Sequence, residues 1–202
     1  MRTRIALLVV MVQLAGMAAG ALAADQYAID PVHTSVGFTV PHLVISRVHG
    51  AFTAVEGTIL YDAEDLTRSS VRVTIQAQSV NTANARRDEH LRSPDFFDAA
   101  AHPEITFEST RIEPQGDGYV CRGTLTIRGV SKAVAIPFKV LGQVVDPMGK
   151  TRIAVEGALT INRQAFGVSW NKTLDNGGFV VGDEVQITLN VEAIRQAEGV
   201  TP

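Results

Sequence analysis

The chain has 202 residues, of which 46% are hydrophobic and 19% are charged, and its formal net charge is −3. This length suits one domain or a tight pair of domains, with enough residues to bury a substantial core. The charged fraction is too high for a protein with many membrane spans, and the apolar fraction is too high for a disordered chain. Because there is no basic excess to hold a phosphate backbone, we expect no nucleic-acid partner.

The first 23 residues have the layout of a secretory signal peptide. Arg2 and Arg4 precede an apolar stretch, and Ala21-Leu22-Ala23 has the small-x-small pattern of a cleavage site. An N-terminal membrane anchor is the alternative, because the weakly polar stretch is nearly long enough to cross a bilayer. We predict a signal peptide over 1–23, a single domain over 24–202, and export to a bacterial periplasm.

Apolar and polar residues alternate with a period of two in eight stretches, which predicts eight β-strands, each with one apolar face. The stretches are 32–40, 55–61, 71–77, 105–108, 119–128, 134–140, 153–161 and 185–191. Gln115-Gly116-Asp117-Gly118, Gly129 and Asp146-Pro147-Met148-Gly149 supply turns between neighbouring strands. Short links and one-sided alternation favour antiparallel pairing.

Three segments lack this alternation. Residues 41–49 suggest a short helix or a turn, 84–91 are compatible with a helix, and 163–183 predict a long loop between the last two strands. Such loops are usually functional or mobile. Phe52 has the opposite parity from the strand that follows it, so we expect a bulge near that point.

Eight antiparallel strands can close into a barrel without exposed edges or pack as a filled sandwich, and alternation alone does not decide between them. A barrel of this size is filled by side chains or holds one small ligand. The inward positions carry many Val and Ile but few large aromatic residues. Gly37, Gly57, Gly123 and Gly157 lie in or beside strands, where a strand bends or a ligand comes close.

The chain resembles the YceI-like family of bacterial polyisoprenoid-binding proteins from about Tyr27 to Ala193, through a set of motifs in order. These motifs are Ile29-Asp30-Pro31 with His33, Phe38, His42, Gly50-Ala51-Phe52, Arg87-Asp88-Glu89-His90-Leu91, Phe96-Phe97-Asp98, His102-Pro103, Thr106-Phe107, Gly123-Thr124-Leu125-Thr126-Ile127-Arg128-Gly129-Val130, Asn162-Arg163, Phe166-Gly167 and Val181-Gly182-Asp183-Glu184-Val185. The sequence departs mildly at Tyr27, where the family often has Trp, and at Thr34, where it often has Ser.

The resemblance implies an all-β fold, an eight-stranded antiparallel lipocalin-like barrel with a short helix and a long loop between the last two strands. It implies an apolar tunnel that holds an isoprenoid lipid, such as a quinone tail or a polyprenyl chain. It also implies periplasmic export and a homodimer, but no reaction. We therefore expect a binding, storage or transport protein that is not an enzyme.

We expect no required cofactor beyond a bound isoprenoid lipid or quinone, and we allow for transient contact with a membrane. Two alternatives stay open. One is an enzyme that acts on an isoprenoid quinone, and the other is an accessory interaction module for a membrane electron-transfer system.

The tunnel candidates are apolar residues of inward parity, joined by aromatic residues of the connecting segments. They are Val36, Phe38, Val73, Ile75, Phe97, Ile105, Phe107, Leu125, Ile136, Phe138, Val155, Leu159, Phe166 and Trp170. The alternative for each is plain core packing. Phe166, Trp170 and Phe179 are candidates for a lid over the mouth, with a loop packed on the barrel exterior as the alternative.

Arg87, Asp88 and His90 are the candidates for contact with an anionic or carbonyl head group at the mouth. A helix places Arg87 and His90 near one face because they are three residues apart. The alternative is structural, with Arg87 and Asp88 fixing the helix to the barrel rim, and the frequency of charges at helix ends favours it.

The five histidines, His33, His42, His49, His90 and His102, lack the spacing typical of metal ligands, so we predict no metal site. The sequence contains no nucleophile elbow, phosphate-binding loop or dinucleotide fingerprint.

A catalytic triad of Asp30, His33 and Ser35 is conceivable, but Asp30 precedes a proline turn where it would cap backbone N–H groups. The single cysteine, Cys121, excludes an intrachain disulfide. Cys121 shares the parity of Leu125 and is expected to be a small core residue rather than a nucleophile.

Overall fold

The computed structural model describes residues 24–175 and 178–197, so the predicted signal peptide lies outside the described residues. The strands are β1 (Asp25–Ile29), β2 (Ser35–His42), β3 (Ser46–Phe52), β4 (Val55–Tyr61), β5 (Ser70–Gln76), β6 (Val80–Asn81), β7 (Glu104–Gln115), β8 (Gly118–Ile127), β9 (Val130–Val145), β10 (Thr151–Asn162) and β11 (Glu184–Arg195). The helix α1 spans Ala85–Arg92, and three short 3-10 turns are η1 (Leu66–Arg68), η2 (Ala77–Ser79) and η3 (Arg163–Phe166). Nowhere in this part of the chain is a helix both long and apolar enough to cross a membrane.

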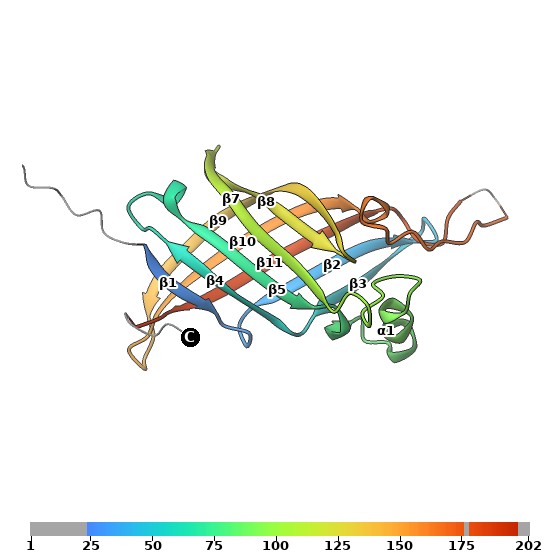
Figure 1. The fold of residues 1–202 in the computed structure, drawn as a ribbon, viewed down its shortest axis with the longest axis horizontal. Coiled ribbons are helices and arrows are strands. Elements are labelled where there is room, and N and C mark those ends of the chain that lie inside the picture. Colours follow the sequence, from blue (N-terminus) through green and yellow to red (C-terminus); the bar gives the residue numbers. More distant parts are fainter. Residues whose placement is uncertain (1–23, 176–177, 198–202) are drawn as a thin grey trace, which may run out of the picture.

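The strands form an eight-stranded antiparallel barrel in which three of the eight strands are interrupted (Figure 1). β1 and β2 both pair with β11 and share one position around the barrel. β4 and β3 share the next position, and β5 and β6 share the third. β7 to β11 then follow in order, and the pairing of β1 with β11 closes the ring. The predicted barrel is therefore confirmed, and the sandwich alternative is wrong.

The short turns arise where the sequence predicts them. β7 and β8 are joined by Gly116 and Asp117 alone, and Gly116 has a φ of 60°. Between β9 and β10, Asp146 Oδ1 accepts hydrogen bonds from the backbone N–H groups of Met148 and Lys150, both at 2.9 Å. The Asp146 N–H also donates to the carbonyl oxygen of Lys150 at 2.9 Å, so carboxylate and backbone hydrogen bonds together close the turn.

The helix suggested for 41–49 is wrong, because these residues form the end of a hairpin. β2 continues to His42 and β3 begins at Ser46, which leaves a three-residue turn. The Leu43 N–H donates to the carbonyl oxygen of Val180 at 2.9 Å, and His42 forms a β-bridge with Val181. Pairing with the long loop therefore holds this segment extended.

The parity change at Phe52 comes from a break in the strand rather than a one-residue bulge. Thr53 and Ala54 separate β3 from β4, so Phe52 pairs with Val80 while Val55 pairs with Ile75. Across the gap, the Thr53 N–H donates to the carbonyl oxygen of Ser79 at 3.2 Å. Both Phe52 and Val55 consequently face the interior.

The two ends of the barrel differ. At the end near both described termini, Tyr27, Ile153 and Ala193 are almost fully buried, and the Tyr27 ring meets Tyr61 edge-on at 5.7 Å. At the other end lie α1, the β2–β3 hairpin and the loop between β10 and β11 (Figure 1). We call this second end the mouth.

Candidate functional site: an apolar cavity in the barrel

A cavity of about 430 Å³ occupies the inside of the barrel. Its lining comes from all eight positions around the barrel, from α1 and from the loop between β10 and β11. It runs from Tyr61 and Ile153 near the closed end to His42 and Trp170 near the mouth. The volume lies within the roughly 300–1,000 Å³ of typical small-ligand sites, and the lining is overwhelmingly apolar.

Every residue proposed for the tunnel lines this cavity. On β7, for example, Ile105 and Phe107 point inward, whereas Thr106 is not part of the lining. Strand parity was thus sufficient to place the strand residues among them, because alternate residues of a strand face opposite sides of the sheet. Their contact with a ligand stays a prediction.

The cavity also has lining residues that the site prediction omitted. Val185, Ile187, Leu189 and Val191 line it from β11, and their alternation is visible in the sequence. Phe52 lines it because of the break after β3, which alternation did not locate.

Two glycines let aromatic rings lie close against the barrel wall. A Cβ atom on Gly123 would lie 2.6 Å from Cζ of Phe107, and one on Gly50 would lie 2.4 Å from Cζ of Phe38. Both distances are far inside van der Waals contact, so any larger residue would displace the ring. These strand glycines therefore make room for side chains that form the cavity wall.

Aromatic side chains gather where the cavity reaches the mouth. The ring centroid of His90 lies 5.0 Å from those of Phe96 and Trp170, and Phe96 and Trp170 are 5.3 Å apart. His90 Nε2 also lies 2.8 Å from a carboxylate oxygen of Asp95. His90 is therefore fixed by a carboxylate on one side and by two rings on the other.

The predicted lid residues divide into two groups. Phe166 and Trp170 line the cavity, whereas Phe179 is 54% exposed and lies farther out on the loop. The N-cap side chain of Asn162 accepts hydrogen bonds from the N–H groups of Gln164 and Ala165, which starts η3 and turns Phe166 inward. The described part of the loop thus carries Phe166 and Trp170 to the cavity.

The head-group candidates Arg87 and His90 line the cavity, and Asp88 does not. Asp88 is buried, and one carboxylate oxygen accepts hydrogen bonds from the N–H and hydroxyl groups of Thr82. Burial raises the pKa of Asp88, but the Thr82 hydrogen bonds and the charges of Arg92 and Arg87 outweigh it and lower the pKa overall. Asp88 is thus placed as a carboxylate that fixes α1, in line with the structural alternative.

Arg87 combines a structural contact with a place in the cavity wall. Its Nε donates to the hydroxyl of Thr82 at 2.7 Å, and Nη2 donates to the carbonyl oxygen of Thr82 at 2.8 Å. These two hydrogen bonds hold the Arg87 guanidinium at the mouth, where Arg87 forms part of the cavity lining.

Arg163 is a functional candidate that the sequence reasoning missed. It is 5% exposed, lines the cavity, and donates hydrogen bonds to backbone carbonyl oxygens of Val168, Trp170 and Gly182. Desolvation lowers its pKa, against the opposing effect of Asp183. Its only sequence signal was its place in the Asn162-Arg163 motif.

Cys121 is buried and lines the cavity, as its parity predicts. Burial raises the pKa of its thiol to about 11. The thiol is therefore protonated at neutral pH and a poor nucleophile.

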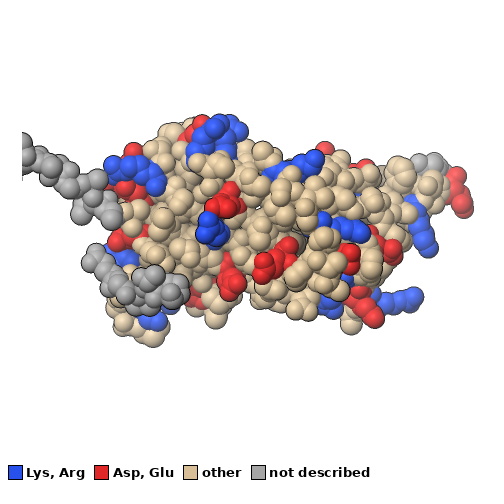
Figure 2. Space-filling view, in the orientation of Figure 1, with Lys and Arg blue, Asp and Glu red and all other residues tan. Residues whose placement is uncertain are grey.

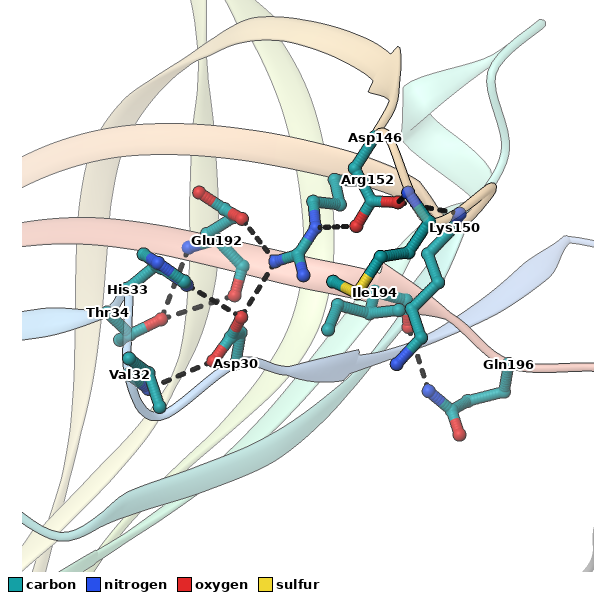
Figure 3. A network of polar contacts seen from close by, with 11 residues as sticks. Asp30, Val32, His33, Thr34, Asp146, Lys150, Arg152, Glu192, Ile194 and Gln196 are labelled. Atoms are coloured by element: carbon teal, nitrogen blue, oxygen red, sulfur yellow. Dashed lines mark hydrogen bonds and ion pairs between the residues drawn. The ribbon is translucent and has the colours of Figure 1, made fainter.

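A polar network lies outside the cavity, where the β1–β2 break meets the β9–β10 turn (Figure 3). Arg152 Nη1 donates to Asp30 at 2.7 Å and to Glu192 at 2.5 Å, while Nε donates to Asp146 at 2.7 Å. These residues come from the β1–β2 break, the β9–β10 turn, β10 and β11. The Arg152 guanidinium therefore joins four separate segments at the β1–β2 break, which we call the barrel seam. This gives the Ile29-Asp30-Pro31 motif a structural role.

The same network bears on the triad and metal hypotheses. Asp30 Oδ2 lies 2.8 Å from His33 Nδ1, and Asp30 Oδ1 accepts the N–H of Val32, as a turn-capping carboxylate does. Asp30, His33 and Glu192 bring ligand atoms within 4.8 Å of one another. Both carboxylates already share the Arg152 cation, so the donor set fits a structural ion-pair network better than a metal ion.

Charged side chains are scattered over the face shown in Figure 2, with both signs intermingled. Among the described residues, His33 is the one histidine that belongs to a group with metal-ligand spacing. His49, for example, lies on a different strand, with Nδ1 3.0 Å from the Thr39 hydroxyl.

The closed barrel and its apolar cavity define the class of small β-barrels that enclose a hydrophobic space. Residues 27–193 match the YceI-like domain, and the chain belongs to this family. A UPF0312 protein of Pseudomonas paraeruginosa is 40% identical over 178 residues, which cover 87% of this chain and 90% of that protein. The protein YceI of Salmonella newport is 36% identical over 179 residues, which cover 88% and 91% of the two chains.

Solved structures show the same fold. The crystal structure of Burkholderia cenocepacia BcnA has a TM-score of 0.71 and 27% identity, covering 81% of this chain and 98% of that chain. The Campylobacter jejuni YceI protein has a TM-score of 0.66 and 31% identity, covering 78% and 90%. A polyisoprenoid-binding domain from Saccharophagus degradans has a TM-score of 0.60 and 16% identity, covering 84% and 98%, and shows likeness of fold.

Proposed function

We propose that this protein binds an isoprenoid lipid by its hydrocarbon tail inside the barrel and stores or transports it in the periplasm. The observation that carries the proposal is the apolar cavity, which runs along the barrel and is covered at the mouth by an aromatic-bearing loop. Membership of the YceI-like family supports it, as does the fold shared with a domain described as polyisoprenoid-binding.

The affinity can come from the tail alone. Each buried CH₂-sized group contributes about 0.8 kcal/mol, so a few five-carbon units leave several kcal/mol after the costs of association. An isoprenoid chain carries no hydrogen-bonding groups, and the barrel wall around the cavity offers almost none. The match is therefore one of apolar shape, because the tail brings no polar group of its own that would be left unpaired.

The head group would then lie at the mouth. Arg87 and His90 are the polar lining residues that α1 places beside the aromatic cluster, and both N–H donors suit a quinone carbonyl or a phosphate oxygen. We propose these two residues as head-group contacts, with Asp88 as their structural support through Thr82.

Two further parts of the proposal come from the sequence and the resemblance. Export follows from the predicted signal peptide over 1–23. A homodimer follows from the family resemblance, and a barrel closed by the pairing of β1 with β11 would form it through its outer surface.

Organic extraction of the native, processed protein followed by mass spectrometry tests the proposal. We expect an isoprenoid lipid in a near-stoichiometric amount, and uptake of an offered polyprenol or quinone by stripped protein. Trp170 is the single tryptophan and lines the cavity, so quinone entry would quench its fluorescence. Protein that carries no isoprenoid and takes up none contradicts the proposal and favours the interaction module, whereas turnover of a bound quinone favours the enzyme.

A further inference from the structure

Large apolar side chains stand exposed at the outermost part of the mouth. Val44 and Ile45, in the β2–β3 turn, are 78% and 87% exposed, and Phe179 in the long loop is 54% exposed. A groove lies between the two segments and includes Val44, Ile45, Phe179 and Val181 among its walls. We call Val44, Ile45 and Phe179, with the flanking cations Arg47 and Lys172, the apolar tip.

The apolar tip is one unit built on paired backbone. The Leu43 N–H donates to the carbonyl oxygen of Val180 at 2.9 Å, and the Gly182 N–H donates to that of Pro41 at 2.9 Å. Within the loop, Thr173 and Phe179 form a β-bridge. The hairpin and the loop therefore present their apolar side chains together.

The apolar tip is also continuous with the cavity. Pro41 and Val181 line both the groove of the tip and the cavity in the barrel. A hydrocarbon chain that leaves the cavity at this side of the mouth would pass directly along the tip.

The turn conformation is one that favours glycine or asparagine. Leu43 and Val44 have φ values of 54° and 67°, and a β-branched residue in this region is strained. Leu43 and Val44 therefore strain the turn, and Val44 and Ile45 expose apolar surface that lowers the solubility of the hairpin. Strain that persists at an exposed site points to a use for the side chains it presents.

The charges around the tip suit an anionic lipid surface. Arg47 is the single charged residue in 31–55, in a chain whose net charge is −3. Lys172 lies opposite the residue after Phe179, because its carbonyl oxygen accepts the Val180 N–H at 3.0 Å. Asp175 is the opposing charge within the loop, whereas Asp183 is engaged by Arg163 and Gln164. Basic residues beside exposed Val, Ile and Phe are the composition of a membrane-interface anchor.

We infer that the apolar tip docks on the surface of a lipid bilayer, with Ile45 and Phe179 inserted at the boundary of head groups and acyl chains. The inference rests on the proposed function, because it names the partner from which the barrel takes its isoprenoid. Docking in this orientation places the mouth against the bilayer, so the tail moves between two apolar phases without crossing water. A second copy of the chain seated on the tip would instead cover the mouth.

Vesicle sedimentation with the processed full chain tests the inference. The vesicles are phosphatidylethanolamine and phosphatidylglycerol at about 3:1, without any isoprenoid. The Ile45→Ser/Phe179→Ser variant should lose about 100-fold in partition coefficient, because each of the two buried apolar side chains contributes roughly a factor of ten. Arg47→Gln should lose about fivefold, and added salt should remove that difference.

The matched control is Val32→Ser/Met148→Ser, which removes two apolar side chains that are 80% and 73% exposed. Val32 lies beside the Arg152 network (Figure 3), and the Met148 N–H donates to Asp146 of that network. This variant should partition as the unaltered protein does. Equal loss in both double variants would show that binding is not localised at the tip and would overturn the inference.

Isoprenoid loading from detergent solution separates the docking inference from the proposed function. The tip variant should load like the unaltered protein in detergent and load more slowly from isoprenoid-containing vesicles. Protein that binds vesicles through the tip but loads no isoprenoid contradicts the proposed function alone. Protein that loads isoprenoid but does not bind vesicles overturns docking, as does a tip substitution that changes only the oligomeric state.

Discussion

Arg163 and Trp170 are joined by a hydrogen bond of 3.0 Å from the guanidinium to the backbone carbonyl oxygen of the tryptophan. The same guanidinium donates to the carbonyl oxygens of Val168 at 2.6 Å and Gly182 at 2.8 Å. Val168 and Trp170 belong to the outgoing arm of the loop, and Gly182 to its returning arm. One buried cation thus holds both arms against the barrel and keeps Trp170 in the cavity wall.

We expect Arg163→Met to loosen the loop and to lower the free energy of unfolding by roughly 2–4 kcal/mol. The reason is that several hydrogen bonds to a charged, buried donor are lost together. Chemical denaturation measures the effect, and Trp170 fluorescence should shift toward that of an exposed indole.

The matched control is Arg195→Met, which breaks the exposed ion pair of Arg195 and Asp25. Its cost should stay below about 1 kcal/mol, because surface pairs contribute little. If Arg163→Met costs no more than this control, Arg163 does not fasten the loop.

Acid should weaken the barrel seam through Asp30. Hydrogen bonds from His33 and Arg152 hold the pKa of this carboxyl well below its ordinary value of about 3.8. A lowered pKa in the folded state adds stability that is complete above the unfolded-state pKa and is lost as the pH falls below it. We therefore expect the free energy of unfolding to drop below about pH 4.

The Asp30→Asn variant should be less stable than the unaltered protein at pH 7, with a difference that shrinks as the pH falls below 4. Denaturation curves between pH 2.5 and 7 measure this. A constant difference over that range would show that the carboxylate charge of Asp30 does not stabilise the seam.

Cys121 should resist thiol reagents in the native protein. With its pKa at about 11, its thiolate fraction at pH 8 is about 100-fold smaller than that of an ordinary thiol, and burial slows the reagent further. Labelling with a disulfide reagent should proceed at an appreciable rate only in denaturant. Rapid labelling of native protein would show that β8 has another register or that the cavity opens readily.

The regular strands were predictable because one face of each strand is buried. The apolar residues of that face alternate with polar ones in the local sequence. The irregular parts depend on residues distant in sequence. The break after β1 is held by Asp30 and Arg152, which are 122 positions apart. The predicted strand 134–140 ends where β9 bulges between Val140 and Gly142, and this bulge reverses the parity, so that Gln143 pairs with the inward-facing Ile153.

The candidate site follows the same division. Inward parity alone is enough to assign Phe38, Phe107 and Phe138 to the cavity wall, where all three side chains lie. Arg163 was not found, because an isolated arginine in a loop gives no local sign that its partners are backbone carbonyl groups. Asp88 was grouped with Arg87 by proximity in sequence, whereas the helix directs its carboxylate to Thr82.

The last prediction concerns occupancy of the cavity and uses one strand as its own control. Phe107 on β7 lines the cavity and is 8% exposed, so Phe107→Asp places an unpaired carboxylate against a ligand tail. An unpaired buried charge is expensive, and it is relieved by protonation, by entry of water or by expulsion of the tail. We expect this variant to lose its co-purifying lipid and several kcal/mol of stability.

Thr106→Asp changes the neighbouring residue, which pairs with Thr74 and Thr126 and lies outside the cavity lining. It should keep the lipid, because position 106 differs from 107 in the face of the sheet that it occupies. Val155→Trp supplies an uncharged test, since a larger side chain in the cavity wall competes with the tail for the same space. Extraction and mass spectrometry of all three variants measure how much lipid each one carries. Equal amounts of lipid in folded Phe107→Asp, Val155→Trp and Thr106→Asp would place the lipid outside this cavity. Neither a charge nor a larger side chain in the cavity wall would then affect binding.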